Sequence, residues 1–458
     1  MENGVTLKRS LGLWAVVVLG LGYLTPAVVF DTFGIVSGDT NGHVPTAYII
    51  ALVAMLFTAF SYGKMVRVYP TSGSAYTYAQ RTMGPRIGFF VGWLSLLDYL
   101  LLPMVNVLLG KIYLEAIFPN IPSWIWVIAF VLFFSIVNMT SLNTTANLSK
   151  LFVLYQVLII GTFIVLAIME LKKGMGYGQV FTPAPFFSGD MNLSSLVTGA
   201  TVLCFSFLGF DAITTYSEET DNPKRTIPLA IFLTAIIGGV IFIVSSYFAQ
   251  AIYPNVSVFQ NPDATAPEIA LYVGGKIFQL IFLSSSFVGV IASGLASQAS
   301  VSRLLYVMGR DGVLPKKTFG YVHPKWRTPV FNIGMVGVIS SSAIFFNLET
   351  ATAFINFGSL IAFSFVNLSV IAHYAVKNKQ VKTMKDIFNN IVLPLIGFSF
   401  VFVLWLNIEP TSFILGLSWA AIGTVYVLFI TKVFKVNLKN LIFDQNEQVL
   451  PILNEVAK

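Results

Sequence analysis

Carboxylates set in apolar surroundings are the residues in this sequence whose chemistry needs explaining first. Asp211 lies within residues 203–219, a stretch of mostly apolar, aromatic and hydroxyl side chains, and Asp98 and Asp31 occupy similar settings earlier in the chain. A charge left in hydrocarbon costs about 2.5–3.5 kcal/mol even on lenient scales, so such residues usually face a cavity or a pathway. The three aspartates are therefore candidates for a site that receives a cation.

Aromatic residues and glycines accompany these carboxylates. The further candidates for the same site are Gly22, Tyr23, Tyr99, Phe205, Phe207 and Gly209. A diamine carries two ammonium groups on an apolar chain, so two separated carboxylates with aromatic walls between them would suit it. The alternative is that each aspartate is a structural hydrogen-bond partner of a broken helix and that the aromatic rings only pack.

The composition predicts the elements that must position these residues. Of 458 residues, 56% are hydrophobic and only 10% are charged, against about 25% charged residues in soluble domains. Apolar stretches of about twenty residues recur along the whole chain, which predicts an all-α integral membrane protein. The single cysteine excludes an intramolecular disulfide, and no metal-binding spacing is present, so we expect no cofactor and no metal.

The apolar stretches predict twelve transmembrane helices, with a lipid bilayer as their surroundings. They cover residues 11–36, 44–66, 87–116, 124–142, 151–171, 196–217, 227–252, 277–301, 330–348, 352–376, 389–408 and 411–431. With a cytoplasmic N-terminus, the outer loops hold only Lys111, Lys172, Lys173 and Lys276 of the 27 basic residues. The positive-inside rule then places both termini in the cytoplasm, and it explains the net charge of +7 without nucleic acid.

Two of the predicted spans contain residues that interrupt helices. The first span includes paired glycines and Pro26 between residues 20 and 26, and the sixth includes Gly209. Proline and glycine weaken the helical hydrogen-bond ladder, and breaks in helices one and six are typical of two inverted five-helix repeats with the ligand between them. The alternative is that these residues merely aid helix packing.

Three polar loops follow the second, sixth and eighth spans, and they carry the resemblance to a known family. They are residues 69–78, then 218–228 with Glu219 and Arg225, then 302–312 with Arg303, Arg310 and Asp311. Nearly residue for residue, they resemble the cytoplasmic signatures of the amino acid/polyamine/organocation transporter superfamily. Segments 22–38, 96–100 and 209–212 are similar to the bacterial putrescine importer branch.

The resemblance implies a fold and a cellular location. The fold is LeuT-like, with the first repeat at 11–172, the inverted repeat at 196–376, two additional helices at 389–431, and cytoplasmic tails at 1–10 and 432–458. It also implies a multi-pass protein of the bacterial cytoplasmic membrane, a symporter driven by the proton-motive force. We expect no obligatory protein partner.

The function that the resemblance implies is import of putrescine or a similar small aliphatic amine by alternating access. Asp98 and Asp211 would hold the ammonium groups, and Glu219, Arg225, Arg303, Arg310 and Asp311 would form a cytoplasmic gate. The first break lacks the Gly-Ser-Gly element with which related amino acid carriers bind a carboxylate. An amino acid permease for small or acidic side chains stays the alternative, because Gly22 and Gly209 can still offer amides.

Coupling has several candidates. Gln156 aligns where some proton-coupled relatives resemble one another in having a lysine, so the proton would pass through Asp98 or Asp211 instead. Sodium is a second option, because Ser293 and Ser297 offer oxygen ligands. A sensor that keeps the fold without flux is disfavoured by the short C-terminal tail, and an enzyme is disfavoured because no nucleophile and base are paired in any span.

Overall fold

The computed structural model describes residues 7–433 except 119, 141, 190, 256–258, 260–264, 347 and 409. Ten helices in this part of the chain are long and apolar enough to cross a membrane. Two shorter apolar helices, Val330–Ile344 and Ser412–Leu428, lie where the ninth and twelfth spans are predicted. The all-helical prediction is thus confirmed, and the chain has the composition of a multi-pass membrane protein.

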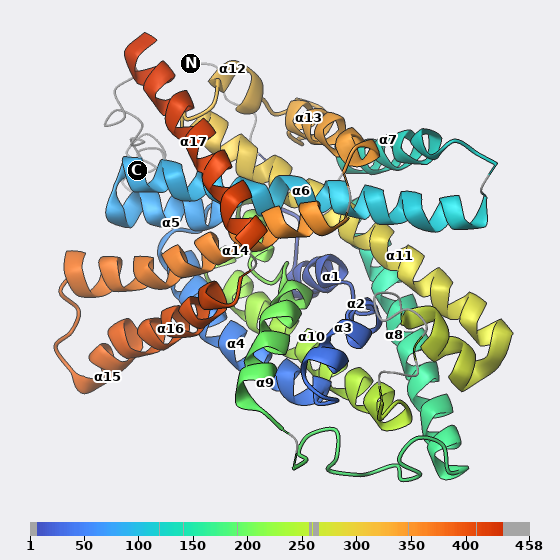
Figure 1. Ribbon diagram of the computed structural model, residues 1–458. Coiled ribbons are helices and arrows are strands. Elements are labelled where there is room, and N and C mark those ends of the chain that lie inside the picture. Colours follow the sequence, from blue (N-terminus) through green and yellow to red (C-terminus); the bar gives the residue numbers. More distant parts are fainter. Residues whose placement is uncertain are drawn as a thin grey trace.

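The helices appear in Figure 1 under the labels used below. Their bounds are α1 Leu13–Leu24, α2 Val28–Asp31, α3 Phe33–Asp39, α4 Val44–Val68, α5 Ser74–Met83, α6 Pro85–Ile117, α7 Ser123–Thr140, α8 Leu142–Lys172, α9 Leu193–Leu203, η1 Cys204–Phe207, η2 Ala212–Glu219, α10 Pro223–Ile252, α11 Ala266–Arg310, α12 Lys316–Phe319, α13 Val330–Ser340, η5 Ser341–Ile344, α14 Leu348–Val370, η6 Ile371–Lys377, α15 Met384–Ile387, η7 Phe388–Val392, α16 Leu393–Leu406 and α17 Pro410–Val433.

Both predicted interruptions are present. Helix α1 ends at Leu24, and Thr25 has a φ of 55° before the chain resumes as α2. Pro26 supplies no N–H, so it cannot continue the ladder of α1. In the second interruption, α9 ends at Leu203, a 3-10 turn follows, and Gly209 has a φ of 120° before η2 begins. Each break therefore contains a left-handed residue.

The two breaks touch each other. A side chain at Gly209 would come within 2.4 Å of the Tyr23 ring, so glycine is required both by this contact and by its φ. Gly20 and Gly22, in contrast, stay inside α1, where Gly20 lets Ile213 and Thr234 approach closely. Gly20 therefore serves close helix packing, whereas the helix is interrupted at residues 25–27.

The eighth predicted span, 277–301, is shorter than the helix observed. Helix α11 runs from Ala266 to Arg310 with a kink at Gly275, whose φ is 68°. It continues past residue 301 because the polar side chains there are buried and paired, Arg303 being only 1% exposed. Part of the loop predicted at 69–78 is likewise helical, as the start of α5.

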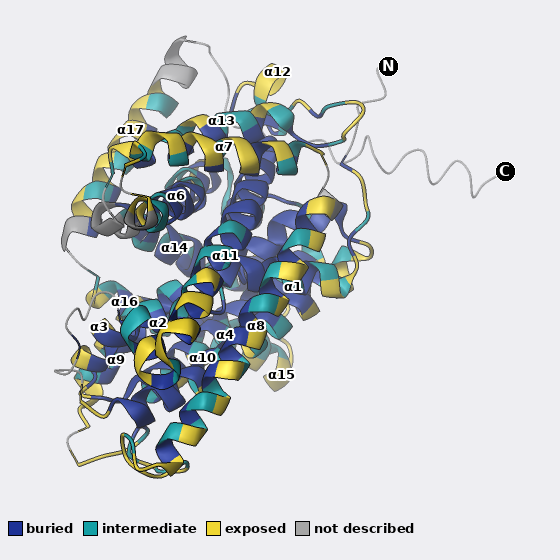
Figure 2. Ribbon diagram, turned by 90° about the vertical axis from the view of Figure 1, so that its right-hand side faces the viewer, coloured by how far each residue is buried: buried dark blue, intermediate teal, exposed yellow. Residues whose placement is uncertain are grey.

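Helix α1 lies in the middle of the bundle, where it packs against α8, α10 and α11 (Figure 1). Helices α4 and α10 pack along each other, as do α6 and α14. Helix α7 has many exposed positions (Figure 2), and its exposed residues include the apolar Ile128, Leu132 and Ile136. Only 28% of the α7 span is buried against 67% of the α6 span. This pattern suits lipid around the bundle and a polar site within it.

Candidate functional site

Asp211 lies at the second break, between Gly209 and η2. Its Oδ2 accepts hydrogen bonds from Tyr99 Oη at 2.9 Å and Tyr62 Oη at 3.5 Å, and its Oδ1 accepts from the Gly209 amide at 3.3 Å. The residue is 2% exposed. Three donors point at this carboxylate, an arrangement that favours the ionised form and fixes its orientation.

Asp98 lies on α6, backed by Gly358 of α14. A Cβ at Gly358 would come within 2.6 Å of the Asp98 backbone nitrogen, so the two helices meet closely here. The Asp98 side chain is buried, and its Oδ1 has no hydrogen-bond partner within the described structure. Asp98 and Asp211 interact electrostatically with each other. The two carboxylates are therefore near enough for the charge of one to affect the other.

No ion pair among the described residues reaches Asp31, Asp98 or Asp211. Buried charges in proteins are normally paired or neutralised, because an isolated one is costly. Asp211 is compensated only by neutral donors, and one oxygen of Asp98 is uncompensated. A bound cation would therefore neutralise negative charge that the described residues leave unpaired.

The predicted aromatic residues divide into two groups. Tyr23 and Phe205 line a central cavity, and Tyr99 donates to Asp211. Phe207 instead packs against Tyr48 and Phe242, with ring centroids 6.4 and 5.4 Å away, and does not line that cavity. Phe207 is thus placed as a packing residue beside the break.

The central cavity has a volume of about 50 Å³, which is room for a few water molecules. Its polar lining comes from four elements: α1 and α2 on either side of the first break, then α6 and α11. The lining includes Tyr23, Asp31, Asn106, Phe205, Ser286 and Ser293. Asp98 and Asp211 do not line this cavity. Tyr23 does line it, and it interacts electrostatically with both aspartates.

Gln156 on α8 holds the first break. Its Oε1 accepts a hydrogen bond from the Ala27 amide at 3.2 Å. Its Nε2 is buried without a partner in the described structure. Gln156 therefore satisfies one of the amides freed where α1 ends, a structural role that sequence alone did not assign.

Ser293 and Ser297 use their hydroxyls within the protein. Ser293 Oγ donates to the Tyr23 carbonyl at 3.1 Å and accepts from Asn106 Nδ2 at 3.0 Å. Ser297 Oγ donates to the Ser293 carbonyl at 2.6 Å. These contacts tie α11 to the first break and to α6.

Charged residues predicted to form a gate meet at one end of the bundle. Arg303 forms a bidentate ion pair with Glu219, and both side chains are at most 2% exposed. Arg310 pairs with Glu218, while Asp311 accepts from Tyr76 Oη at 3.0 Å. The Ser10 and Leu11 amides donate to the Glu219 carbonyl. The start of the chain, η2 and α11 are thereby locked together.

Two further observations qualify this charged end. Arg225 is exposed in the first turn of α10, whereas the Arg303–Glu219 pair is buried. Burial raises the pKa of the Asp311 carboxyl above its ordinary value, and Arg310 and the hydrogen bond from Tyr76 oppose that rise. Asp311 is thus held mainly by Tyr76 and Arg310.

Sequence reasoning missed Tyr62 and Asn106. Tyr62 lies on α4 and donates to Asp211, and Asn106 links α6 to Ser293. The only available signal was that each places a polar group inside an apolar span. Such a group needs a partner, but periodicity does not say which one.

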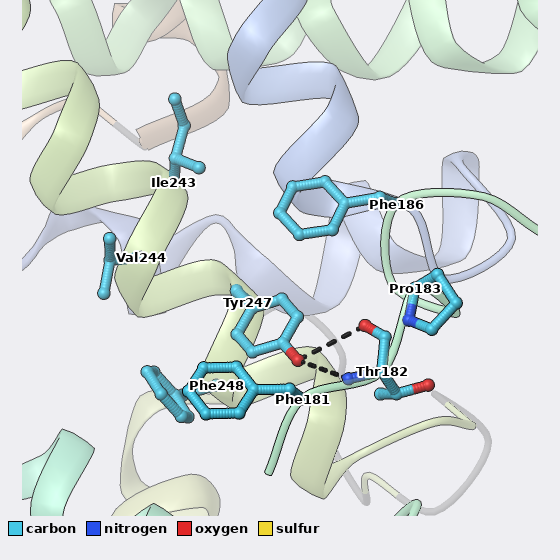
Figure 3. Close-up of a pocket in the computed structure, with 8 residues that line it drawn as sticks. All are labelled: Phe181, Thr182, Pro183, Phe186, Ile243, Val244, Tyr247 and Phe248. Carbon is cyan, nitrogen blue, oxygen red and sulfur yellow. Dashed lines mark hydrogen bonds between the residues drawn. The ribbon is translucent and has the colours of Figure 1, made fainter. Parts of the chain in front are cut away.

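A larger groove lies at the edge of the molecule and is apolar. It has a volume of about 540 Å³ between residues 181–186 and α10. Figure 3 shows the Tyr247 hydroxyl hydrogen-bonded to the backbone of Thr182, with Phe186 and Phe248 around the Tyr247 ring. None of the side chains that line this groove is charged, so it does not share the character of the central site.

Comparison with known proteins gives consistent matches over most of the chain. The family model described as amino acid permease matches residues 15–436. The low-affinity putrescine importer PlaP of Escherichia coli (strain K12) is 54% identical over 431 residues, which are 94% of this chain and 95% of that protein. Two Bacillus subtilis (strain 168) proteins are each 25% identical: the methylthioribose transporter, over 93% of this chain and 94% of its own, and the branched-chain amino acid permease BcaP, over 94% and 95%.

Proposed function

The chain belongs to the amino acid permease family and is a transport protein, and on this premise we propose that it imports putrescine or a similar small aliphatic amine. The resemblance predicted from the three polar loops is confirmed by the family match. The observation that carries the choice of an amine is the buried Asp98 and Asp211 pair, which no lysine or arginine in the described structure neutralises.

The backbone at the two breaks supports an amine over an amino acid. A substrate carboxylate would need free amides, as at helix N-termini. Pro26 has none, and the amides of Thr25, Ala27 and Val28 already donate to Leu21, Gln156 and Thr25 respectively. At the second break, the Gly209 amide donates to Asp211. A ligand without a carboxylate fits these satisfied amides better.

The proposed architecture follows the inverted-repeat fold. In this proposal, residues 11–172 and 196–376 are the two repeats, residues 389–431 add two helices, and the total is twelve spans. The observed breaks in α1 and after α9 support it, because such breaks flank the midplane site of these transporters. Both termini would lie in the cytoplasm of a bacterial cell.

The charged end would then be the cytoplasmic gate. The Arg303–Glu219 and Arg310–Glu218 pairs would hold this end closed. Alternating access would require these pairs to separate when the site opens inward. The pairs thus stabilise the outward-facing or occluded arrangement relative to the inward-facing one.

Proton coupling would use Asp98. A buried carboxylate with one unpartnered oxygen is most stable when it is protonated or faces a cation. For symport, Asp98 would take up a proton from outside while Asp211 binds an ammonium group, and both the proton and the substrate would be released to the cytoplasm when the site opens inward. Sodium has less support, because the hydroxyls of Ser293 and Ser297 are bonded to the protein.

The test is uptake of labelled putrescine by cells that lack their own putrescine carriers. Wild-type chain should give saturable uptake, and Asp211→Asn should reduce it at least tenfold at equal protein in the membrane. Asp39→Asn, an exposed aspartate at the end of α3, is the matched control and should transport normally. Competition by serine or glutamate but not by putrescine would instead identify an amino acid permease.

A further inference from the structure

Asp31 is the one carboxylate that lines the central cavity, since the site proposed above uses Asp98 and Asp211, which do not line it. Asp31 ends α2, immediately beyond the first break. No hydrogen bond or ion pair of the described structure involves its side chain. This carboxylate therefore needs a role of its own.

The surroundings of Asp31 suit an ammonium group. The cavity brings Tyr23, Asn106 and Ser286 close to it, and these residues offer oxygen atoms, that of Ser286 having no hydrogen-bond partner in the described structure. Tyr113 of α6 also interacts electrostatically with Asp31. No lysine or arginine lines the cavity. A primary ammonium group donates three hydrogen bonds, so a carboxylate with neutral oxygens around it can accept all three.

The position of Asp31 along the path follows from the chain. Helix α1 starts beside Glu219 at the closed, charged end, and Asp31 comes after α1 and the break, on the other side of it. Tyr23 lines the cavity, and its ring lies against Gly209, whose amide donates to Asp211. Tyr23 thus stands between the Asp31 cavity and the inner pair of aspartates.

From this placement we propose that Asp31 and its cavity form an entry site, where an ammonium group of the substrate binds before it passes Tyr23 to reach Asp98 and Asp211. The proposal rests on the proposed function. The cavity holds only a few waters as it stands, so substrate binding must widen it, and the outward opening of the α2 region would supply that space.

The first experiment separates entry from later steps. Initial rates of putrescine uptake are measured over a range of concentrations for wild type, Asp31→Asn, Asp31→Glu and Asp39→Asn. Asp31→Asn should raise KM at least tenfold with less than a twofold change in the maximal rate, because the inner site is intact. Asp31→Glu should recover most of the affinity, and Asp39→Asn should match wild type.

The outcomes distinguish the two proposals. Absence of saturable putrescine uptake by wild type would overturn the proposed function, whereas normal uptake with an unchanged KM in Asp31→Asn would overturn only the entry site. An equal loss of affinity in Asp39→Asn would also contradict it, since the effect would then be general surface charge.

A second experiment covers the case in which Asp31→Asn fails to fold. Cys204 is the sole cysteine of the chain, so Ser286→Cys in a Cys204→Ala background places one thiol at the cavity. A cationic methanethiosulfonate reagent should label it at least fivefold faster than an anionic one, and putrescine should slow the labelling. Equal rates for both reagents, or no protection by putrescine, would contradict a cation entry site.

Discussion

At the scale of single residues, the carboxylates of the site differ in the number of hydrogen bonds that they accept. Asp211 receives three hydrogen bonds, from two tyrosines and a backbone amide, whereas Asp98 keeps one oxygen without a partner. Hydrogen-bond donors favour the charged form of a carboxylate, and a poorly satisfied carboxylate gains most from a proton or a cation. Asp211 is thus suited to hold an ammonium group, and Asp98 to carry a proton together with it.

Replacing Asp98 should separate binding from coupling. In Asp98→Asn, the neutral amide removes the group that binds the co-transported proton, so accumulation of putrescine against a gradient should fall at least tenfold. Exchange of internal for external putrescine, which needs no net proton movement, should persist at half the wild-type rate or more. Accumulation and exchange of putrescine are measured in membrane vesicles, with a protonophore as control. Accumulation equal to wild type would exclude Asp98 as the coupling residue.

At the scale of elements, the site depends on contact between the two breaks. The Tyr23 ring lies where a side chain at residue 209 would be, and the Tyr23 carbonyl accepts from Ser293 of α11. Gln156 of α8 holds the Ala27 amide on the other side. The breaks are therefore fixed by neighbours rather than left loose, so movement of α8 or α11 would be transmitted to the site.

Substituting Gly209 should disturb this contact directly. Gly209→Ala places a Cβ against Tyr23 and forces alanine into a φ of 120°, which should cost about 1–3 kcal/mol of stability. Thermal unfolding of the purified protein should show a lower midpoint, together with weaker putrescine uptake. Gly161→Ala on α8 is the control, because nothing lies within 4 Å of its added methyl. Equal midpoints for Gly209→Ala and wild type would contradict the close fit.

At the scale of the whole molecule, hydropathy predicted most of the arrangement. Span positions followed from apolar length, and the interruptions followed from Pro26 and Gly209, whose backbone chemistry is local. The sequence did not show that Gly20 remains helical or that α11 extends to Arg310. Both depend on distant partners, Ile213 for the glycine and Glu219 for Arg303, and local patterns carry no information on them.

Part of the candidate site was predictable for the same reason. A carboxylate in an apolar span is visible in the sequence, so Asp98, Asp211 and Asp31 could be singled out. The sequence could not show which of them line the same cavity, because this depends on how α2, α6 and the second break meet. Asp31 lines the cavity while the other two lie outside it, an arrangement that only the packed structure displays.

The charged end of the molecule, with its Arg303–Glu219 pair, should behave as one electrostatic unit. Removing one member of a buried ion pair leaves an uncompensated charge and costs about 3–5 kcal/mol. Glu219→Gln and Arg303→Met should therefore each lower the unfolding midpoint strongly, and the double variant should recover part of the loss. Arg225→Gln, at an exposed position, should leave it unchanged. Additive losses in the double variant would contradict a direct pairing.

The central claim is that buried, unneutralised aspartates receive a positively charged substrate, and ligand-dependent stability of the purified protein tests it most directly. At 100 times Kd, putrescine should stabilise the wild-type fold by about 2.7 kcal/mol. Asp211→Asn should lose most of this stabilisation, whereas Asp39→Asn should keep it. Equal stabilisation of Asp211→Asn by putrescine, or stabilisation of the wild type by serine or glutamate and not by putrescine, would contradict the account.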